Sequence, residues 1–462
     1  MPAEDYENDT IVALSSAPGR SGVGVIRISG PATLDIIFTV FKSKYLSDIS
    51  FKDRHATYGL LIDPDTSSVI DDGIAIFMEG PATYTGEDVV ELTLHGSPVI
   101  LNSAIRLLIS RGARLAHRGE FTRRAFLSGR MDLIQAEAVI DLIESETPGQ
   151  VHDARKRIDS RLSDEVFSIS SRLKDVGALI ENFLDFDDDE EGPVPLPTDE
   201  LYDVRRDIES LLESSRSGRF SSRGLTAVIT GKPNVGKSTL FNALLGSDRM
   251  IISETPGTTR DPVTEKVYID GVAITLGDTA GVRDNPDTIE NEGIKRTLEW
   301  VNNCDVALVV LDSSQPIDTD DLTVMESVGA KPKMIIFNKI DKDQKAQAPE
   351  QLGASEEKIF RTSAKTGAGL DELRAGIGKL AAHLRESDEF SEKGSLNDRA
   401  LLLMESAYGD VCSAFDLLEH NGKLELVSLE IKSACDKIDE ITGQKFTEDV
   451  LDRIFERFCV GK

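Results

Sequence analysis

Short runs of alternating hydrophobic and polar residues, separated by Gly, Pro and Asp, characterise roughly the first 120 residues of the chain. An alternation with a period of two is typical of half-buried β-strands. The predicted elements are strands at Thr10–Leu14, Val23–Ile28, Thr57–Ile62, Ile74–Met78 and Val89–Leu94, and a helix at Pro98–Ser110. Strands combined with a helix in this way predict an α+β domain, to which we assign residues 1–120.

After residue 120 the hydrophobic spacing changes to the three-and-four pattern of helices. One helical face is predicted from Leu133, Ala136, Ile140 and Ile143. The acidic run 185–191 precedes three prolines, so we expect an exposed loop before a second helix that starts with Thr198 as its N-cap. A further apolar stripe before a helix stop at Gly443 consists of Val427, Ile431, Ala434, Ile438 and Ile441.

Between the two helical stretches, the apolar runs lack alternation, as is typical of parallel strands buried on both faces. The runs are Leu225–Thr230, Ala273–Leu276, Val306–Leu311, Met334–Phe337 and the strand-like Ile359–Thr362. Because they alternate with helical segments, they predict a doubly wound α/β domain at residues 223–380. We therefore expect this domain to be inserted into an all-helical domain formed by residues 121–222 and 381–462.

Composition narrows the function classes. The 462 residues include 81 acidic and 52 basic side chains, a formal net charge of −29, which argues against non-specific nucleic-acid binding over the whole surface. A local basic patch at Arg118, Arg123, Arg124 and Arg130 stays open, and a solvated helix face is the alternative. No apolar run approaches the ~20 residues of a membrane span, and no secretory signal is visible. With four cysteines and no C-x-x-C pair, we expect a cytoplasmic protein in which Cys304, Cys412 and Cys435 are reduced thiols.

The segment from Gly231 to Ser238 matches the phosphate-binding pattern G-x-x-x-x-G-K-[ST], between a predicted strand and a predicted helix. Its glycines allow backbone N–H groups to surround phosphates. Lys237 is expected to reach the β- and γ-phosphates, and the Ser238 hydroxyl to bind Mg²⁺. The motif therefore predicts a nucleotide site, with a simple glycine-rich turn as the structural alternative.

Three further motifs follow strands in the same domain and indicate that the base is guanine. Asp278-Thr279-Ala280-Gly281 supplies a carboxylate for Mg²⁺ and a backbone N–H for the γ-phosphate. In Asn338-Lys339-Ile340-Asp341, the last carboxylate can accept two hydrogen bonds that guanine donates and adenine cannot. Ser363-Ala364-Lys365 is expected at the base edge. Open α/β sheets bind ligands at these strand ends, so we predict GTP as substrate.

The loop at Gly257-Thr258-Thr259 is expected to order around GTP and release after hydrolysis, with Thr259 as a Mg²⁺ ligand. Many GTPases orient the attacking water with a Gln after D-T-A-G, where this chain has Val282. Another group must then position the water, and Glu290 and Glu292 are downstream candidates. The predicted GTP-binding residues are Asn234, Val235, Gly236, Lys237, Ser238, Thr239, Ser253, Glu254, Thr255, Pro256, Gly257, Thr258, Thr259, Asp278, Thr279, Ala280, Gly281, Asn338, Lys339, Asp341, Ser363, Ala364 and Lys365.

Together with segments near both ends, these motifs resemble the MnmE (TrmE) family of tRNA-modifying GTPases. The segments that carry the resemblance outside the α/β domain are Thr10–Ala13, Pro18–Gly30, Tyr84–Glu91, Arg118–Thr122 and Phe458–Lys462. The resemblance implies a homodimer that binds a tetrahydrofolate derivative (the 5-formyl or 5,10-methylene form) through the N-terminal domain. Arg27, Glu91, Arg130 and Lys462 stand at the family's folate positions.

The resemblance also implies a biological role. With an FAD- and NADH-using partner of the MnmG (GidA) type, the family adds aminomethyl or carboxymethylaminomethyl groups to C5 of the wobble uridine, U34, of certain tRNAs. In the family a K⁺ ion replaces an arginine finger, and it would be bound here by Asn234, Ser253, Thr255 and Thr258. Glu290 matches the catalytic Glu. Cys459 matches a family Cys, with a nucleophile and a small buried residue as its two interpretations.

Two alternative functions remain at this stage. A ribosome-assembly GTPase would share the motifs between Gly231 and Lys365 but would not need the N-terminal module or the Phe458–Lys462 segment. A nucleotide-gated interaction protein with negligible turnover is compatible with Val282. Stimulation of GTP hydrolysis by K⁺ over Na⁺ would discriminate against the second.

Overall fold

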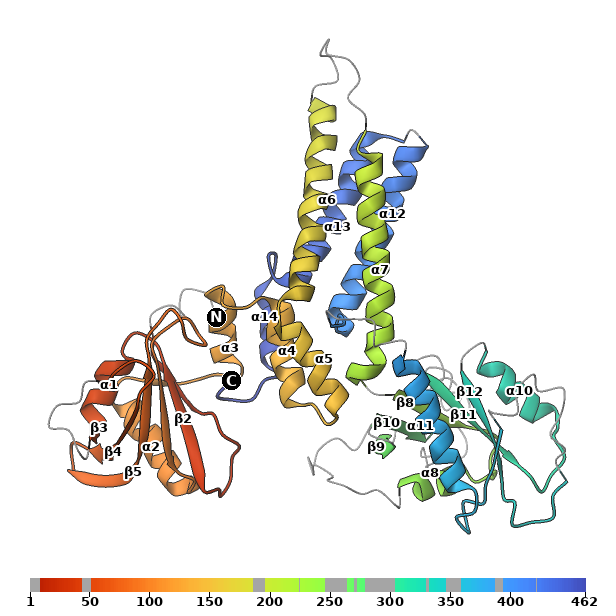
Figure 1. Ribbon diagram of the computed structural model, residues 1–462, viewed down its shortest axis with the longest axis horizontal. Helices are drawn as coiled ribbons and strands as arrows, with labels where there is room; N and C mark the ends of the chain where they lie inside the picture. The colour runs from red at the N-terminus through yellow and green to blue at the C-terminus, as the bar shows by residue number, and fades with distance from the viewer. Residues whose placement is uncertain are drawn as a thin grey trace, which may run out of the picture. The chain divides into compact units, whose positions relative to one another are not determined.

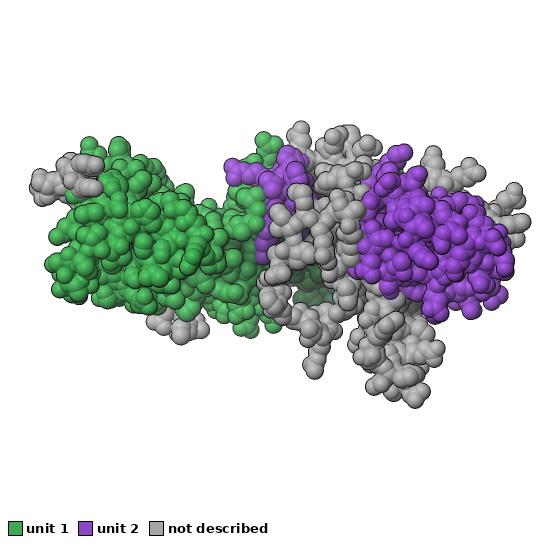
Figure 2. Space-filling model, turned by 90° about the horizontal axis from the view of Figure 1, so that it is seen from below, with its two compact units in different colours: residues 1–143, 157–209, 398–462 green, residues 144–156, 210–397 purple. Residues whose placement is uncertain are grey.

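The computed structural model describes residues 9–43, 51–185, 196–223, 225–245, 264–269, 272–278, 304–329, 332–345, 359–386, 394–420 and 422–462. The chain forms two compact units, which Figure 2 colours separately. Unit 1 comprises residues 1–143, 157–209 and 398–462, and unit 2 comprises residues 144–156 and 210–397. The helix α5 (Pro148–Ile158) and the helix α7 (Thr198–Arg223) each continue from one unit into the other.

Unit 1 contains a seven-stranded sheet with the order β3-β4-β5-β6-β2-β1-β7 (Figure 1). Its neighbours pair antiparallel except β1 and β7, which are parallel. The strands are β1 (Ile11–Leu14), β2 (Val23–Ser29), β3 (Phe41–Ser43), β4 (Ala56–Asp63), β5 (Ser68–Met78), β6 (Val89–His95) and β7 (Arg114–Leu115). The predicted strands are confirmed, although β5 begins at Ser68 and not at Ile74 as predicted.

Two helices, α1 (Thr33–Val40) and α2 (Pro98–Ser110), share a buried core with this sheet. The buried residues of α2 are Leu101, Ala104, Leu107 and Leu108, which follow the three-and-four spacing of one helical face. The partners on the sheet include Ile26, Ile28 and Leu92, all fully buried. Alternation on the strands and helical spacing on α2 thus specify the same core.

Helices form most of the remaining described part of unit 1 (Figure 1). They are α3 (Glu120–Leu127), α4 (Leu133–Ile143), α6 (Arg161–Asp185), the first part of α7, α12 (Asp398–Glu419), α13 (Leu424–Thr442) and α14 (Glu448–Phe455). The longest of them are α6, α7, α12 and α13. Helix α13 packs against α12 and α6 through the predicted stripe, whose five residues are all buried, and ends at Gly443 with φ +82°. The prediction for α4 was wrong at Ile143, which is 48% exposed. Thr198, the predicted N-cap, is instead the first residue of α7, so the helix begins one position earlier than predicted.

Two of the four arginines of the predicted basic patch are buried, so for these two both the patch and the solvated helix face were wrong, whereas Arg118 and Arg130 are exposed. Arg123 and Arg124 on α3 are 6% and 4% exposed. Arg123 pairs with Asp452 at 2.6 Å and with Glu448, both on α14. Arg124 pairs with Glu87 at 3.0 Å and with buried Glu120 at 3.1 Å. Buried guanidinium groups need such partners, so these arginines join elements of unit 1 instead of facing solvent.

Residues after α14 run along the N-terminal sheet. The backbone of Val460 forms a bridge with Arg118, and the Ser15 hydroxyl donates a hydrogen bond to the Gly461 carbonyl at 3.1 Å. Gly461 has φ +99°, and a Cβ atom there would lie 2.1 Å from the Leu14 carbonyl oxygen. Only glycine fits this close approach, which explains the residue before Lys462.

Unit 2 contains a six-stranded sheet with the order β13-β12-β11-β8-β10-β9. All neighbours are parallel except β9 and β10, which pair antiparallel. The strands are β8 (Leu225–Thr230), β9 (Thr264–Ile269), β10 (Val272–Asp278), β11 (Val306–Asp312), β12 (Lys333–Asn338) and β13 (Ile359–Arg361). Alternate residues of β11 enter two different cores, one containing Leu308 and one containing Val309, so this strand is buried on both faces as predicted.

The described helices of this unit include α8 (Lys237–Leu245), α10 (Thr319–Ser327) and α11 (Leu370–Glu386). The predicted acidic loop at 185–191 lies, apart from Asp185, outside the described residues. Among the described helices, none is long and apolar enough to cross a membrane.

Candidate functional site

The carboxyl ends of the parallel strands in unit 2 gather the predicted nucleotide motifs at one sheet edge. Strand β8 leads into the loop that starts at Gly231, and β10 ends at Asp278. On the other side of β8, β11 ends at Asp312 and β12 ends at Asn338, and these two residues lie opposite each other in the ladder. Such an edge is where open α/β sheets bind ligands.

The loop after β8 depends on backbone conformations that favour glycine. Gly231 has φ +151°, and a Cβ atom there would lie 2.4 Å from the Val310 carbonyl oxygen. Gly236 has φ +100°, and its Cβ would lie 2.4 Å from Nδ2 of Asn338. Asn234 adopts φ +64° without being glycine, a conformation that asparagine tolerates better than most residues. The close approach of Gly236 to Asn338 shows that the phosphate-binding loop and the Asn338–Asp341 motif are in direct contact.

Helix α8 starts at Lys237, so Ser238 and Thr239 lie in its first turn and are exposed. The N-terminus of a helix presents backbone N–H groups and a positive dipole end, which suits phosphate oxygens. The Lys237 ammonium donates to the carbonyl oxygens of Gly231 at 2.7 Å and Lys232 at 2.8 Å. This arrangement holds the ammonium across the loop that the motif assigns to phosphates.

Asn338 connects three of the motifs from a position that is 2% exposed. Its Nδ2 donates to the Val235 carbonyl at 3.0 Å, and its Oδ1 accepts a hydrogen bond from the Ala364 backbone N–H at 3.0 Å. The amide therefore fixes the phosphate loop and the Ser363–Lys365 loop relative to each other. A buried amide with both ends bonded is a structural link as well as part of a binding motif.

Asp341 is exposed, as a residue that reads a base must be, and Ser363 donates a hydrogen bond to its Oδ1 at 2.6 Å. This hydrogen bond holds the pKa of the Asp341 carboxyl below its usual value. The carboxylate is therefore ionised at neutral pH and able to accept hydrogen bonds from the ring N–H and amino group of guanine.

Two acidic groups at this edge were missed by sequence reasoning. Asp312 accepts a hydrogen bond from the Lys339 ammonium at 2.7 Å, and Asp318 accepts one from Lys232 at 2.7 Å. Asp312 is the residue directly after the predicted strand Val306–Leu311, so its position at the end of a buried strand was the available signal. Asp318 is the N-cap of α10 and forms a capping box with Asp321, a pattern also readable from sequence.

A second group of predicted residues lies in unit 1. Arg27 on β2 and Glu91 on β6 occupy paired positions in the sheet, and Nη2 and Nε of Arg27 donate to Oε1 of Glu91 at 2.7 and 3.0 Å. The guanidinium carbon lies 5.6 Å from the ring centroid of Tyr84 and 5.7 Å from that of Phe121. Burial and the nearby Arg27 charge lower the pKa of Lys462, which places this third predicted residue within electrostatic range of the pair.

The remaining predicted residues of unit 1 have different surroundings. Nε of Arg130 donates to the Thr83 carbonyl at 3.1 Å, next to the loop that carries Tyr84. The carbonyl of Cys459 accepts a weak hydrogen bond from Gly119 at 3.4 Å, but the residue is exposed. The interpretation of Cys459 as a small buried residue was therefore wrong for this chain, and its role as a nucleophile stays a prediction.

Several predicted residues lie outside the described part of the chain, including the switch loop and the proposed water-positioning groups. These are Ser253, Glu254, Thr255, Pro256, Gly257, Thr258, Thr259, Thr279, Ala280, Gly281, Val282, Glu290 and Glu292.

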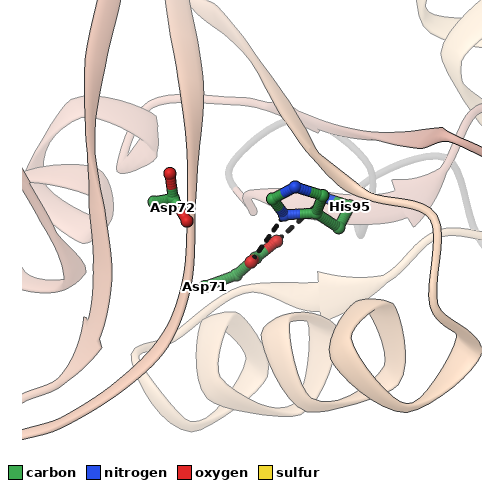
Figure 3. Close-up of side chains that lie close together, drawn as sticks. All are labelled: Asp71, Asp72 and His95. Carbon is green, nitrogen blue, oxygen red and sulfur yellow. Dashed lines mark hydrogen bonds and ion pairs between the residues drawn. The ribbon is translucent and has the colours of Figure 1, made fainter.

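Asp71, Asp72 and His95 form a separate cluster on the N-terminal sheet (Figure 3). Oδ1 of Asp71 lies 2.9 Å from Nδ1 of His95, and its Oδ2 accepts the His95 backbone N–H at 2.8 Å. Figure 3 shows Asp71 pointing toward His95, whereas Asp72 lies apart from that pair. Asp72 instead accepts a hydrogen bond from Tyr58. The hydrogen bond that the His95 ring donates to Asp71 raises the pKa of His95, so we interpret the cluster as an ion pair.

Comparisons with solved structures give local likenesses of low overall similarity. Aquifex aeolicus Era bound to GDP and AlF4⁻ is 28% identical, with a TM-score of 0.27, over 40% of this chain and 66% of that chain. The G domain of the T. maritima FeoB iron transporter is 23% identical, with a TM-score of 0.25, over 34% of this chain and 98% of that chain.

Comparisons with family profiles and whole sequences cover nearly all of this chain. Residues 10–130 match the family described as GTP-binding protein TrmE N-terminus, and residues 133–459 match the MnmE helical domain. The chain is 38% identical to tRNA modification GTPase MnmE of Alkaliphilus oremlandii, across 99% of its own length and all of that protein. It is 37% identical to the protein of the same name from Geobacter sulfurreducens, with the same coverage of both chains. The chain therefore belongs to the MnmE (TrmE) family of tRNA modification GTPases.

Proposed function

We propose that this GTPase hydrolyses GTP in a K⁺-stimulated reaction and uses a tetrahydrofolate one-carbon unit to modify C5 of the wobble uridine U34 of certain tRNAs. It would act in the cytoplasm as a homodimer with an FAD- and NADH-dependent partner of the MnmG type. The product would be an aminomethyl or carboxymethylaminomethyl group. The observation that carries the proposal is the group of Arg27, Glu91 and Lys462, which lies in the same chain as a guanine-nucleotide edge.

The donor set of this group fits a reduced folate. The Glu91 carboxylate can accept hydrogen bonds from a pterin amino group and ring N–H, and the two cations suit an anionic carboxylate or a formyl oxygen. Tyr84 and Phe121 add aromatic surface beside the Arg27 guanidinium. When bound, the folate would supply the one-carbon unit, while these residues hold and orient it. Arg130 would contribute a further cation near the Thr83–Tyr84 loop.

In the nucleotide site, Lys237 would bind the β- and γ-phosphates, and Ser238 and Thr259 would bind Mg²⁺. K⁺ would be held by Asn234 with Ser253, Thr255 and Thr258. The exposed side chain of Asn234 and the positive φ of its backbone are compatible with an oxygen ligand turned toward the phosphates. A cation there would offset the charge that develops between the β- and γ-phosphates. Glu290 would position the attacking water.

The K⁺ proposal is tested by comparing GTP turnover by the purified full chain in KCl and NaCl at equal ionic strength. We expect turnover to be at least about 10-fold faster in K⁺, since a lost transition-state contact of this kind is worth ~1.4 kcal/mol or more. Glu290→Ala should bind GTP normally and turn it over slowly. Equal, slow rates in both salts would instead favour a nucleotide-gated interaction protein.

The tRNA proposal is tested by deleting the gene and analysing tRNA nucleosides by mass spectrometry. We expect the C5-modified wobble uridines to disappear and to return when the wild-type gene is restored. Unchanged nucleosides together with a defect in ribosome assembly would instead indicate that the protein is a ribosome-assembly GTPase.

A further inference from the structure

Asp312 is held in one orientation by its own turn. It lies at the carboxyl end of β11, and its side chain is 15% exposed. The backbone N–H and the hydroxyl of Ser314 both donate to its Oδ1, at 2.9 and 2.6 Å. The other oxygen, Oδ2, accepts the Lys339 ammonium at 2.7 Å. The carboxylate therefore presents a fixed negative charge to Lys339.

Lys339 also contacts the phosphate-binding loop. Its ammonium also donates to the backbone carbonyl of Asn234 at 2.5 Å. Lys339 has φ +66° and Asn234 has φ +64°, so each end of the contact lies at a backbone conformation that costs energy outside glycine. A side-chain contact between two such residues helps to keep both in place.

A second bond ties the same turn to the guanine motif. The Ser313 backbone N–H donates to the Asn338 carbonyl at 2.9 Å, so the turn after β11 is joined to the guanine loop by its backbone as well as by Asp312. The chain of contacts runs from Ser314 through Asp312 and Lys339 to Asn234. It connects the loop that reads the base with the residue expected to bind K⁺.

We propose that Asp312 is a positioning residue that couples guanine recognition to the cation site, by holding the Lys339 ammonium against the Asn234 backbone. The expected effect of Asp312 on nucleotide affinity follows from these contacts alone. Its expected effect on the K⁺ requirement rests on the proposed K⁺-stimulated function. Loss of the Asp312 charge leaves Lys339 without its acidic partner, so the base loop loosens. The Asn234 carbonyl also loses a fixed donor, so the phosphate loop samples other conformations.

The test compares Asp312→Asn with Asp305→Asn as a matched control. Asp305 directly precedes β11 at the opposite sheet edge, where its Oδ2 accepts the Thr226 backbone N–H at 2.8 Å. For each full-length variant, the affinity for a fluorescent GDP analogue and the K⁺ concentration for half-maximal GTP turnover are measured. For Asp312→Asn we expect about 10-fold weaker nucleotide binding and a several-fold higher K⁺ requirement. We expect Asp305→Asn to change neither.

A double-mutant cycle separates coupling from loss of stability. Lys339→Met should reproduce the effect on affinity, and the double variant should be no weaker than the more affected single variant, because both substitutions break one contact. Melting temperatures report folding, and if Asp312→Asn does not fold, Ser314→Ala, which removes one donor to Asp312 Oδ1, takes its place and should weaken nucleotide binding in the same direction. Additive effects, or unchanged affinity in Asp312→Asn, would overturn the proposal. If wild-type turnover is equal in K⁺ and Na⁺, the K⁺ mechanism fails, while the affinity data still decide the role of Asp312.

Discussion

The two sheets of this protein build their candidate sites in opposite ways. In unit 2, the strands are mostly parallel, and each motif follows the carboxyl end of a strand, so chain order and sheet order bring the groups together. In unit 1, neighbouring antiparallel strands supply Arg27 and Glu91, and Lys462 comes from far along the sequence. The site in unit 2 is therefore contained in local sequence motifs, whereas the site in unit 1 depends on packing between distant parts of the sequence.

The two units also differ in the contacts that hold their site-bearing elements together. Unit 2 joins its motifs through the amide of Asn338 and short contacts between loops. In unit 1, buried Glu120 of α3 pairs with Arg114 on β7 of the N-terminal sheet, and Arg123 ties α3 to α14, whose chain continues to Lys462. The proposed folate site thus relies on charges that are removed from water, which are stable only while each has its partner.

The largest expected effect tests this reliance. Arg124→Met removes one partner each of Asp9, Glu87 and Glu120, the last of which is 1% exposed. We expect the free energy of unfolding to fall by about 3 kcal/mol, because a buried carboxylate loses a cation. Thermal and denaturant unfolding would measure the loss. The control Arg206→Met, at a 61% exposed arginine, should cost less than about 1 kcal/mol. Equal losses would show that burial does not distinguish these pairs.

The next effect concerns contact between motifs in unit 2. In Gly236→Ala the new methyl group would meet Nδ2 of Asn338 at 2.4 Å and sit at φ +100°. We expect GTP affinity to fall about 100-fold, roughly 2.7 kcal/mol, as measured by equilibrium binding. Gly329→Ala is the control, since it has φ +63° in the same unit with nothing within 4 Å of its Cβ. A matching loss of GTP affinity in the control would refute a specific contact.

A smaller effect separates the two sites. Removing Gly461 and Lys462 should weaken binding of 5-formyltetrahydrofolate about 10-fold, because a cation beside Arg27 and Glu91 is lost. GTP affinity should be unchanged, since the nucleotide edge lies in unit 2. Calorimetric titration of each ligand gives both values, and Lys462→Met distinguishes the charge from the close approach of Gly461. Unchanged folate affinity would exclude Lys462 from the site.

The smallest effect concerns pH. The hydrogen bond that the His95 ring donates to Asp71 raises the pKa of His95 above its ordinary value of 6.5. The ion pair therefore contributes its full stability below about pH 6.5 and loses it as pH rises through the folded-state pKa. His95→Gln should lower the melting temperature slightly near pH 5.5 and match wild type near pH 8.5. A difference that grows toward alkaline pH would contradict this assignment.

Much of the fold could be predicted from the sequence, because the alternation of the strands and the three-and-four spacing of the helices match the residues that are buried in the structure. The stripe from Val427 to Ile441 is buried as predicted, and so are the apolar strands β8, β11 and β12. The short strands β3 and β7 escaped prediction because three and two residues carry too little pattern. The antiparallel edge strand β9 was also missed.

The errors concern residues whose surroundings are set by distant partners. Arg123 and Arg124 look like surface charges in sequence, and only the approach of α14 and of the loop carrying Glu87 explains their burial. Asp312 was missed because its partner Lys339 comes from the loop after the next strand, β12. Local sequence states which chemistry a residue can perform, but it does not state which partner it will meet.

The contact between Ser15 and Gly461 has a consequence for the order of synthesis. These residues are 446 positions apart, and all of unit 2 is made between them. The N-terminal sheet can form its core early during translation, as N-terminal domains generally do. Its Arg27–Glu91 pair must wait for Lys462 until the nucleotide-binding unit has left the ribosome. A chain that stops early would carry a folded sheet without this cation, so the proposed folate site would be complete only after the GTPase unit has been made.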